Sequence, residues 1–421
     1  MPDGGAYQRF GAQPRPRVML LAPSMHGGGA ERVAAHLINR CDPASVDVRL
    51  GLLQRTGPYL PDVDPSRVDS SPIGKDWIRY DGDNASFYRP HRLVLGGLLA
   101  PTNVAAMVRG FRPDVMVSFL KGMNVIAYAA RAALGPRPPR WIAREGNNTD
   151  VVIDDEVKNP LGRTLVKTAV RHCYRAADCV LANSHAMARG LERNLGVPHS
   201  RLRVIHNPID IERIQRMASE PLANRSGRRF VVTAGRLEHQ KAHDLLLAAF
   251  ASGAACRELD LVILGEGSLE ARLKAQAAAL GIADRVRFVG FVANPWAYFA
   301  RAELFVLPSR WEGFPTVVAE ALACGAPALV TDCDFGPSEI VEHGHSGWVV
   351  PTNDLAAFRS AMDTMLSQPQ MAAAFAARGR RRVTDFGVAA MVEAYTTLFL
   401  EQATEHRQVL ARAGGLRLAE A

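Results

Sequence analysis

Short runs of apolar residues recur along the chain, and a polar or glycine-containing stretch follows most of them. Such runs, bounded by turn signals, are typical of buried strands in parallel sheets. They lie at residues 17–22, 115–119, 141–143, 228–234, 260–264, 286–291, 304–307, 328–331 and 348–350, with strand-to-loop transitions at 179–184 and 203–210. Helical patterns separate several of these runs, and the alternation predicts an α/β fold.

The length of the chain suits two large domains. Its 421 residues, 48% hydrophobic and 22% charged, are too many for one hydrophobic core. No run reaches the roughly 18 consecutive apolar residues that span a membrane. Residues 1–17 are rich in Gly, Pro and Arg and contain no apolar signal-peptide core. We therefore expect a flexible tail over residues 1–16 and a cytoplasmic protein.

Cysteine spacing indicates the redox state of the thiols, and net charge indicates the class of partner. The six cysteines, at positions 41, 173, 179, 256, 324 and 333, show no paired spacing, which predicts reduced, mostly buried thiols. The net charge of +8 favours an anionic partner. No basic run is interleaved with stacking aromatic residues, so we do not expect nucleic acid as a partner. A phosphorylated substrate or an anionic lipid remains.

The segment 304–327 combines a buried strand, a loop and a short helix. Pro308 and Gly313 mark the loop, and the helix should run from about Pro315 to Cys324, with Pro315 at its first position. Backbone N–H groups in the first turn of a helix have no partner inside it, and the helix dipole adds positive charge there. The segment therefore predicts an anion site.

Two carboxylates frame this helix start. Glu312 lies in the loop, Glu320 lies inside the helix, and the backbone N–H groups of Thr316 and Val317 lie between them. Carboxylates accept hydrogen bonds from hydroxyls. The arrangement suits a ligand with hydroxyls at both ends and phosphates in the middle, which is a sugar nucleotide. Taken alone the spacing is common, and two glutamates without a special role are the alternative.

A glycine-rich loop follows the strand 17–22. Its residues Gly28 and Gly29 allow backbone to approach a phosphate or sugar closely before a helix that runs to about Arg40. The pattern is neither Gly-x-Gly-x-x-Gly nor a P-loop with its lysine, which disfavours NAD and ATP. A flexible glycine turn is the alternative.

Two cations follow the strand 228–234. Arg236 and Lys241 would project from the loop, and two fixed positive charges can hold a diphosphate. Exposed basic residues of an ordinary loop are the alternative. His239 and His243 are four residues apart, but no third ligand is near in the sequence, so we do not expect zinc.

Together these motifs resemble the retaining glycosyltransferases of family 4. The string Gly-Gly-Ala-Glu-Arg-Val from Gly28, the string Gly-Arg-Leu-x-x-x-Lys from Gly235, the Gly265 turn and the Glu-x7-Glu pair from Glu312 appear in the family's order. The resemblance covers residues 17 to about 400. It implies the GT-B fold, in which two Rossmann-like doubly wound domains face a cleft.

The resemblance also implies a division of the chain. Residues 17–207 would form the acceptor domain and residues 208–385 the nucleotide-sugar donor domain, with the boundary near 208–228. A terminal helix, about 386–405, would pack back on the first domain. The irregular stretch 53–90 has the composition of segments that shape acceptor sites in such domains.

By the same resemblance, Glu312 would lie at the donor sugar, Glu320 would hold the ribose, and Arg236 and Lys241 would hold the phosphates. We name Glu312, Arg236 and Lys241 as catalytic. The other donor-binding residues it implies are Gly28, Gly29, Gly265, Glu266, Phe291, Gly313, Phe314, Thr316, Val317 and Glu320. Leu120 and Lys121 stand where many relatives have a histidine that contacts the donor sugar. Residues 121–124, which follow the strand 115–119, are predicted as a polar loop.

The implied reaction moves a hexose or N-acetylhexosamine from a UDP-sugar to a glycan or lipid-linked acceptor in surface polysaccharide or glycoconjugate synthesis. No cofactor or metal is expected, because cations of the protein would meet the phosphate charge. No residue is a convincing general base, which agrees with a departing phosphate oxygen that takes the acceptor proton. Residues 336–339, Gly-Pro-Ser-Glu, resemble relatives that use galactose or N-acetylhexosamine donors.

Three alternatives stay open. A metal-dependent GT-A transferase would use Asp332 and Asp334, although the sequence favours a loop there, with Glu339 near a helix start. An oxidoreductase would need a glycine fingerprint and a redox cofactor. The chain could also be a non-catalytic sugar-nucleotide-binding subunit.

One predicted helix carries a basic residue at every fourth position: Arg163, Lys167, Arg171 and Arg175. Its apolar residues lie around another face: Leu161, Leu165, Ala169 and Val170. A solvated face of a surface helix is the simpler interpretation. The alternative is a peripheral contact with an anionic membrane, which would bring a lipid-linked acceptor to the cleft.

Overall fold

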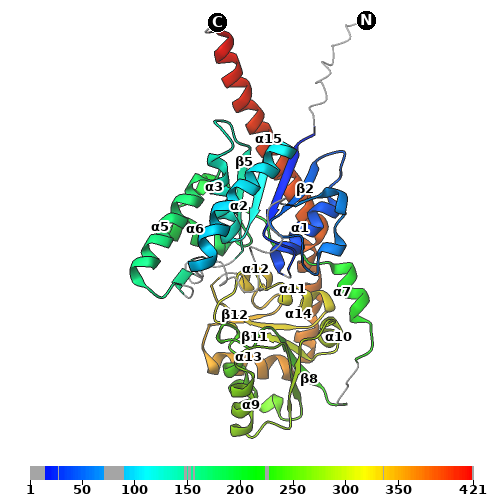
Figure 1. Ribbon diagram of the computed structural model, residues 1–421. Coiled ribbons are helices and arrows are strands. Elements are labelled where there is room, and N and C mark those ends of the chain that lie inside the picture. The colour runs from blue at the N-terminus through cyan, green and yellow to red at the C-terminus, as the bar shows by residue number, and fades with distance from the viewer. Residues whose placement is uncertain are drawn as a thin grey trace, which may run out of the picture. The chain divides into compact units, whose positions relative to one another are not determined.

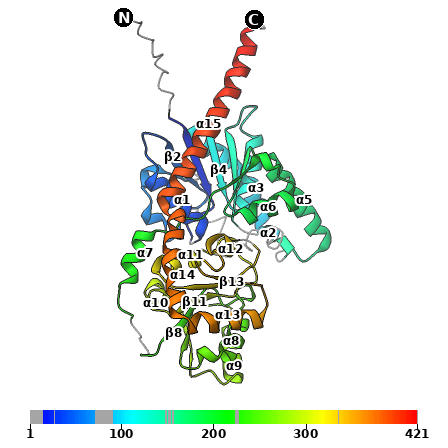
Figure 2. The ribbon, with the colours of Figure 1, turned by 180° about the vertical axis from the view of Figure 1, so that it is seen from behind.

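Alternating strands and helices build two parallel sheets (Figures 1 and 2). The structure is a computed structural model that describes residues 15–26, 28–70, 90–146, 149, 153–154, 157–222, 227–334 and 336–419. Contacts between Cα atoms divide the chain into two compact units. The first comprises residues 1–144, 176–178 and 392–421, and the second comprises residues 145–175 and 179–391.

The seven-stranded sheet has the order β3-β2-β1-β4-β5-β6-β7. Its strands are β1 (Arg17–Ala22), β2 (Asp47–Leu52), β3 (Val68–Ser70), β4 (Val115–Phe119), β5 (Arg140–Glu145), β6 (Cys179–Ala182) and β7 (Leu202–Val204). In the register of the central strand, Leu20 lies opposite Leu50 on one side and Val117 on the other. All three side chains are fully buried, which explains the continuous apolar pattern of these strands.

The six-stranded sheet has the order β10-β9-β8-β11-β12-β13. Its strands are β8 (Phe230–Ala234), β9 (Asp260–Leu264), β10 (Val286–Gly290), β11 (Leu304–Leu307), β12 (Ala328–Thr331) and β13 (Trp348–Val350). Counted from β8 as the first strand, this is the 3-2-1-4-5-6 order of the nucleotide-binding Rossmann fold. The chain order reverses between β8 and β11, which lie side by side.

Helices follow most of the strands. Those before the six-stranded sheet are α1 (Gly29–Arg40), α2 (Pro90–Phe111), α3 (Lys121–Ala132), α5 (Pro160–Ala176), α6 (His185–Leu195) and α7 (Ile211–Ala218). The later ones are α8 (His243–Ser252), α9 (Glu270–Ala279), α10 (Trp296–Phe299), α11 (Thr316–Cys324), α12 (Pro337–Ile340), α13 (Leu355–Ser367), α14 (Pro369–Arg382) and α15 (Val388–Ala419). Within the described residues, none of these helices has the length and apolarity needed to cross a membrane.

The six-stranded sheet buries both of its faces. Alternate strand residues such as Val232 and Val231 point to opposite sides, because side chains of a strand alternate. One face packs against α7, α10 and α11, and the other packs against α8, α9 and α13. At ~25 cal/mol per Å² of buried apolar surface, these two layers stabilise the sheet and so fix its strand ends.

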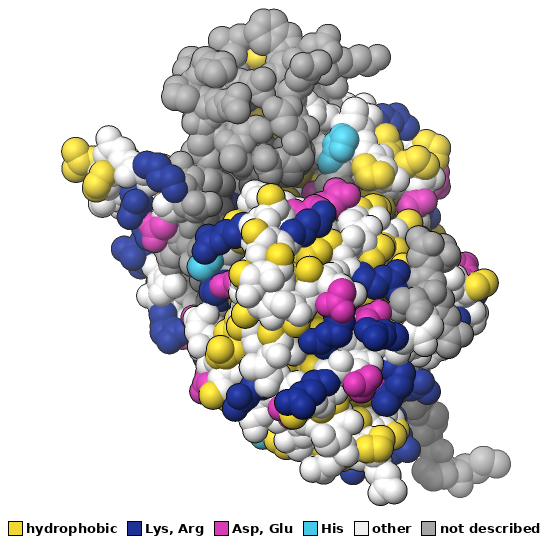
Figure 3. Space-filling model, turned by 90° about the horizontal axis from the view of Figure 1, so that it is seen from below, with side chains coloured by type: hydrophobic (Ala, Val, Ile, Leu, Met, Phe, Trp, Pro, Cys, Tyr) yellow, Lys and Arg dark blue, Asp and Glu magenta, His cyan; other side chains and the backbone are white. Residues whose placement is uncertain are grey.

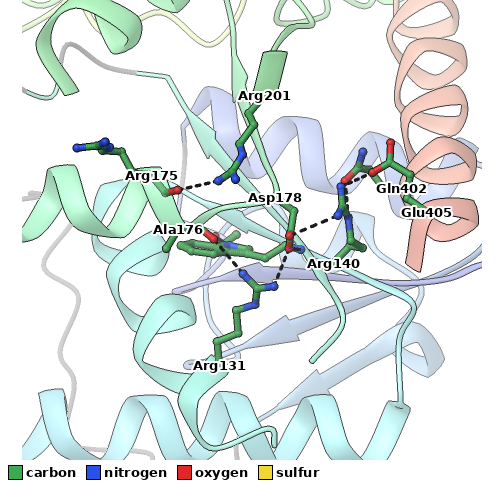
Figure 4. A network of polar contacts seen from close by, with 10 residues as sticks. Arg131, Arg140, Arg175, Ala176, Asp178, Arg201, Gln402 and Glu405 are labelled. Carbon is green, nitrogen blue, oxygen red and sulfur yellow. Dashed lines mark hydrogen bonds and ion pairs between the residues drawn. The ribbon is translucent and has the colours of Figure 1, made fainter. Parts of the chain in front are cut away.

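The long helix α15 is held to the first unit by polar side chains (Figure 4). Arg140 Nε donates to Gln402 at 3.2 Å and its guanidinium pairs with Glu405. Asp178 forms ion pairs with Arg140 at 3.5 Å and with Arg131 at 2.8 Å. The apolar face of α15 contributes Tyr395, Leu398, Phe399 and Ala403, all nearly fully buried.

Several sequence predictions differ from the structure. Residues 121–124, predicted as a polar loop, are the first turn of α3. Residue 120 has a positive φ of 74°, so the turn into the helix is tighter than the sequence suggests. The stretch 53–90 contains two 3-10 turns and β3 before residue 70, and residues 71–89 lie outside the described part. The domain boundary near 208–228 stays a prediction.

Candidate functional site

The candidate site lies where β8 and β11 end, at the reversal point of the six-stranded sheet. Open α/β sheets bind ligands at such points, outside the carboxyl ends of the strands. Two loops start there: the β8 loop, residues 235–242, and the β11 loop, residues 308–315. The first carries Arg236 and Lys241 and the second carries Glu312.

Lys241 and Glu312 are joined directly. Lys241 Nζ lies 2.6 Å from Glu312 Oε1, and both side chains are largely buried, with 13% and 6% exposed. Ser309 Oγ donates to the same oxygen at 2.6 Å. Among the described residues, Oε2 of Glu312 has no hydrogen-bond partner. The carboxylate is therefore fixed through one oxygen, and its other oxygen can accept from a ligand.

A second layer of contacts holds this carboxylate. Thr331, at the end of β12, donates its hydroxyl to the carbonyl of Ser309 at 2.6 Å. The backbone N–H of Glu312 donates to the carbonyl of Asp334 at 3.2 Å. Ser309 and Thr331 are completely or almost completely buried. Buried hydrogen bonds of this kind limit the motion of the side chain they support.

Arg236 differs from Lys241 in its surroundings. Its side chain is exposed, whereas Lys241 is largely buried beside Glu312. A guanidinium at the surface stays free to bind a phosphate that arrives from solvent, and an ammonium has three N–H donors, of which Glu312 takes one. The two predicted cations therefore lie on one loop and remain able to bind oxygen atoms of a ligand.

Gly265 lets the β8 loop approach its neighbour, the turn after β9. Its φ is 133°, and a Cβ built there would lie 2.1 Å from the carbonyl oxygen of Gly235. The backbone N–H of Leu237 also donates to the carbonyl of Glu266 at 2.9 Å. Only glycine fits at residue 265. The role of this turn in donor binding stays a prediction.

Glu266 and Phe291 lie on adjacent strand ends. Phe291 follows β10, is 77% exposed, and donates its backbone N–H to Glu266 Oε1 at 3.3 Å. The exposed aromatic ring of Phe291 offers a face on which a planar base can stack. Gly313, on the β11 loop, has no room for a side chain, because a Cβ there would lie 2.4 Å from the carbonyl oxygen of Gly146.

The start of α11 corrects part of the predicted anion site. Pro315 is the N-cap and not the first helical residue, so the helix starts one residue later than predicted. The backbone N–H of Thr316 donates to the carbonyl of Phe314 at 2.9 Å, so it is not unpaired. Phe314 itself is buried between His206 and Phe386. The path of the loop before α11 determines where the helix starts and which partner the Thr316 N–H group has. The helix pattern in the sequence does not show either.

Glu320 is buried in α11, with 8% of its surface exposed. The indole Nε1 of Trp296, on α10, donates to Glu320 Oε2 at 3.1 Å. The carboxylate also raises the pKa of Cys324, for which burial is the larger cause, to about 12. Glu320 therefore lies in a partly apolar layer, where a hydrogen bond to a ligand hydroxyl is stronger than in water.

Gly28 and Gly29 belong to the first compact unit, where they start α1. A Cβ at Gly28 would lie 2.6 Å from Glu31 Oε2, so a side chain there would displace the end of the buried Glu31 side chain. Burial raises the pKa of Glu31. The role that the sequence predicts for these glycines stays a prediction.

The alternative metal sites receive no support from the described residues. Among them, the only group of three suitably close metal-binding side chains consists of His185, His206 and Glu339, and neither Asp332 nor Asp334 belongs to such a group. Glu339 is itself engaged: its carboxylate accepts from the backbone N–H groups of His185 and Ala186 at 2.9 and 2.8 Å. These bonds and His206 lower its pKa, against the effect of burial. As predicted, Glu339 lies on a short helix, α12.

The sequence did not reveal four further contacts of the site: Ser309, Arg310, Asp244 and Trp296. Arg310 and Asp244 form a two-pronged ion pair at 3.0 and 2.8 Å. They are 66 positions apart, and no local spacing indicates such a pair. Trp296 reaches Glu320 only because α10 packs against α11.

Comparisons with known proteins agree with this geometry. Residues 27–213 match the family described as Glycosyltransferase Family 4, and residues 215–382 match the family described as Glycosyl transferases group 1.

Two named relatives cover much of the chain. It is 30% identical over 287 residues to the N-acetylgalactosamine-N,N'-diacetylbacillosaminyl-diphospho-undecaprenol 4-alpha-N-acetylgalactosaminyltransferase of Campylobacter jejuni, over 66% of this chain and 74% of that protein. It is 25% identical over 374 residues to the lipopolysaccharide core biosynthesis glycosyltransferase LpsE of Rhizobium meliloti, over 88% of this chain and 95% of that protein.

A solved structure shares the fold. The crystal structure of Anabaena Alr3699/HepE in complex with UDP-glucose superposes with a TM-score of 0.70 at 20% sequence identity, over 93% of this chain and 100% of that one.

Proposed function

Because the chain belongs to the family 4 glycosyltransferases and has their GT-B fold, it is a glycosyltransferase, and we propose that its donor is a UDP-sugar. The observation that carries the proposal is the Lys241–Glu312 pair beside the exposed Arg236, at the reversal point of the sheet. Cations there can bind a diphosphate, and the unengaged oxygen of Glu312 can bind a sugar hydroxyl.

The reaction would retain the configuration of the sugar. The bond between the sugar C1 and the phosphate oxygen breaks, and a bond between C1 and the acceptor oxygen forms on the same face. The acceptor proton moves to the departing phosphate oxygen, so UDP leaves with it. Arg236 and Lys241 stabilise the charge that builds on the diphosphate, and Glu312 orients the donor sugar. Glu320, held by Trp296, binds the ribose hydroxyls.

The protein's own cations would balance the phosphate charge without a divalent metal. Each charge-assisted hydrogen bond to a phosphate is roughly twice as strong as a neutral one. Transfer measured after dialysis against EDTA should therefore equal that of the untreated protein. Loss of transfer that Mg²⁺ or Mn²⁺ restores would overturn this part of the proposal.

Calorimetric titration with UDP tests the site. Arg236→Met and Lys241→Met should each weaken UDP binding by about tenfold or more, because each removes a charged hydrogen bond. Lys274→Met is the matched control, since Lys274 also lies 2.6 Å from a carboxylate, Glu270, but with an exposed side chain on α9. Unchanged affinity in both site variants, or no heat with any nucleoside diphosphate, would contradict the proposal.

We propose a hexose or N-acetylhexosamine as the transferred group and a glycan or lipid-linked saccharide as the acceptor, in the synthesis of a surface polysaccharide or glycoconjugate. Support comes from the Campylobacter relative, an N-acetylgalactosaminyltransferase acting on a diphospho-undecaprenol-linked sugar. A thermal-shift panel of UDP-, GDP- and ADP-sugars tests the donor, because a ligand that binds only the folded state raises Tm. A shift with GDP-sugars alone would refute a UDP donor.

A lipid-linked acceptor would require contact with a membrane surface, and α5 suits that contact. Leu161 and Leu165, near its start, are 78% and 71% exposed. The helix contains four basic residues and no acidic one. Its basic row is partly engaged, since Arg163 and Lys167 pair with Asp154 at 3.4 and 2.8 Å. Figure 3 shows hydrophobic and basic side chains next to each other at its left edge, where α5 lies.

Flotation with vesicles that contain anionic lipid tests the membrane contact. The double variant Leu161→Ser/Leu165→Ser should lower partitioning onto the vesicles by about a hundredfold or more, because each exposed leucine contributes about 1.5–3 kcal/mol when buried in lipid. Leu355→Ser, at an exposed leucine of α13, is the control. Equal binding of all variants, or no binding of the unaltered protein, would contradict the contact.

A further inference from the structure

Arg310 joins the two loops of the candidate site. Its guanidinium donates to both carboxylate oxygens of Asp244, at 3.0 and 2.8 Å, and to the carbonyl of His239 at 2.7 Å. Its Nε donates to Asn353 Oδ1 at 3.1 Å. Only 15% of the side chain is exposed. One residue of the β11 loop thus holds the end of the β8 loop and the start of α8.

The backbone of the β11 loop adds two bonds at the same place. The N–H of Arg310 donates to the carbonyl of Gln240 at 2.8 Å, and the side-chain amide of Gln240 donates to the carbonyl of Trp311 at 2.9 Å. The rings of Trp311 and His239 lie 5.9 Å apart. Besides the Lys241–Glu312 pair, the contact between the loops is therefore formed by Arg310, its neighbour Trp311 and residues 239–240.

The β8 loop needs this support because it has little regular structure. Its first half is bound to the turn after β9, through Gly235 and Leu237. Its second half is a single 3-10 turn, His239–Lys241, followed by Ala242 at the unfavourable φ of 50°. Lys241 lies in that second half, so its position depends on the bonds that Arg310 and Gln240 make.

We propose that Arg310 is a positioning residue, which rests on the proposed function of Lys241 and Glu312 in donor binding. By holding residues 239–244 against the β11 loop, it keeps the Lys241 ammonium at Glu312 Oε1 and aimed at the diphosphate. Lysine cannot replace it, because one ammonium cannot reproduce a planar fork that binds Asp244, His239 and Asn353 together.

A double-mutant cycle on UDP affinity tests the proposal. Calorimetry would compare the unaltered protein, Arg310→Lys, Lys241→Met and the double variant. Arg310→Lys should weaken UDP binding by about tenfold, because it misplaces a charged hydrogen bond. In the Lys241→Met background the same change should have almost no effect, because the group that Arg310 positions is absent. Equal losses in both backgrounds would overturn the proposal.

Arg229→Lys is the matched control. Arg229 forms the same two-pronged pair with Glu303, at 2.7 and 2.8 Å, before β8 begins and thus at the other end of that strand. This variant should bind UDP like the unaltered protein. If it loses as much affinity as Arg310→Lys, the effect of Arg310 is general destabilisation and the proposal is wrong.

Asp244→Asn provides a milder second variant if Arg310→Lys does not fold. The amide keeps the shape of the carboxylate but loses its charge, so UDP affinity should fall by about threefold, again only with Lys241 present. An unchanged affinity in this folded variant would contradict the proposal. The failure of the proposed function looks different, since Lys241→Met alone would then leave UDP affinity unchanged.

Discussion

At the scale of the residue, Glu312 is a carboxylate with one oxygen already engaged. Lys241 and Ser309 both bind Oε1, so the direction of the whole group is set before a ligand arrives. Preorganisation of this kind saves the cost of ordering the group during the reaction. Glu312 and Lys241 could be chosen from the sequence by their spacing, but Ser309 could not, because its hydroxyl meets Glu312 only through the path of the loop.

Glu312→Gln should slow glycosyl transfer by a factor on the order of 10² or more, because it removes the charge that we propose orients the donor sugar. UDP should still bind within a few-fold, because Arg236 and Lys241 remain. Initial rates and calorimetry on the same preparation measure both quantities. Glu303→Gln, at the exposed pair with Arg229, is the control. If transfer in the intact system is unchanged, the chain is a non-catalytic subunit.

His243 predicts an acid-sensitive stability. Burial is the main cause that lowers its pKa from 6.5 to about 4, and Lys241 adds to it. As the pH falls below 6.5, His243 is protonated in the unfolded chain but stays neutral in the folded chain. Stability is therefore lost between pH 6.5 and 4, by about 3 kcal/mol for this residue.

Urea unfolding at several pH values measures this loss. His243→Gln cannot titrate, so its stability should decline less steeply than that of the unaltered protein between pH 6.5 and 4. His406, whose pKa burial also lowers, should keep part of the slope in both proteins. Parallel curves for the variant and the unaltered protein would show that His243 does not carry the effect.

At the scale of the element, the site depends on strand ends that are packed closely backbone to backbone. The turns after β8, β9 and β10 meet through Gly235, Gly265 and Gly290, with N–H groups of residues 235 and 265 donating to the carbonyls of Leu264 and Gly290 at 2.9 and 2.8 Å. The sequence showed a glycine at the end of each of these strands. It did not show which atoms lie so close to these glycines that a side chain would contact them.

Gly265→Ala should destabilise the protein by about 3 kcal/mol or more, because both the φ of 133° and the contact with Gly235 oppose a side chain. It should also weaken UDP binding, since the β8 loop must move. Gly135→Ala separates the two causes: its φ is 86°, but nothing lies within 4 Å of the added Cβ. That control should lose only about 1–2 kcal/mol. Equal losses, measured by urea unfolding, would rule out the contact as a cause.

The sequence predicts a helix end correctly where neighbouring residues alone set that end. Gly325 ends α11 with a φ of 81°, as its position after Cys324 predicted. The prediction failed at α3, where residues 121–124 look like a polar loop but start a helix. There Asn124 is fully buried and donates its side-chain amide to the carbonyl of Arg144 at 3.1 Å. Tertiary contacts thus compensate for a weak local helix signal.

At the scale of the whole molecule, the end of the chain returns to the first compact unit. Residues from Val392 onward belong to it, although the preceding residues 179–391 belong to the second. Arg407 pairs with Asp114 at 3.1 Å, and Arg144 donates to Tyr395 at 2.9 Å. The sequence predicted the return of this helix only by resemblance, and it placed the helix end near residue 405, whereas α15 runs to Ala419.

Two truncations test what α15 contributes. A chain that ends at Met391 loses Tyr395, Leu398, Phe399 and Ala403 and should fail to fold, because at roughly 25 cal/mol per Å² their burial is worth several kcal/mol. A chain that ends at Gln408 keeps these contacts and should unfold within a few degrees of the full chain. Circular dichroism melts measure both. Equal stability of the two truncated chains would show that the terminal helix is dispensable.

The sequence by itself determined the class of fold and the family, and it predicted the main charged residues of the candidate site. Buried parallel strands, glycines at strand ends and the spacing of Arg236, Lys241, Glu312 and Glu320 are local signals, and each depends on a few neighbouring residues. Only the tertiary structure decided which partners these residues have. Arg310 meets Asp244 across 66 positions, and Trp296 meets Glu320 across two helices, because the packing of the sheet brings those elements together. Hydrogen-bond direction over such separations depends on the folded path of the chain, and residue spacing does not encode it.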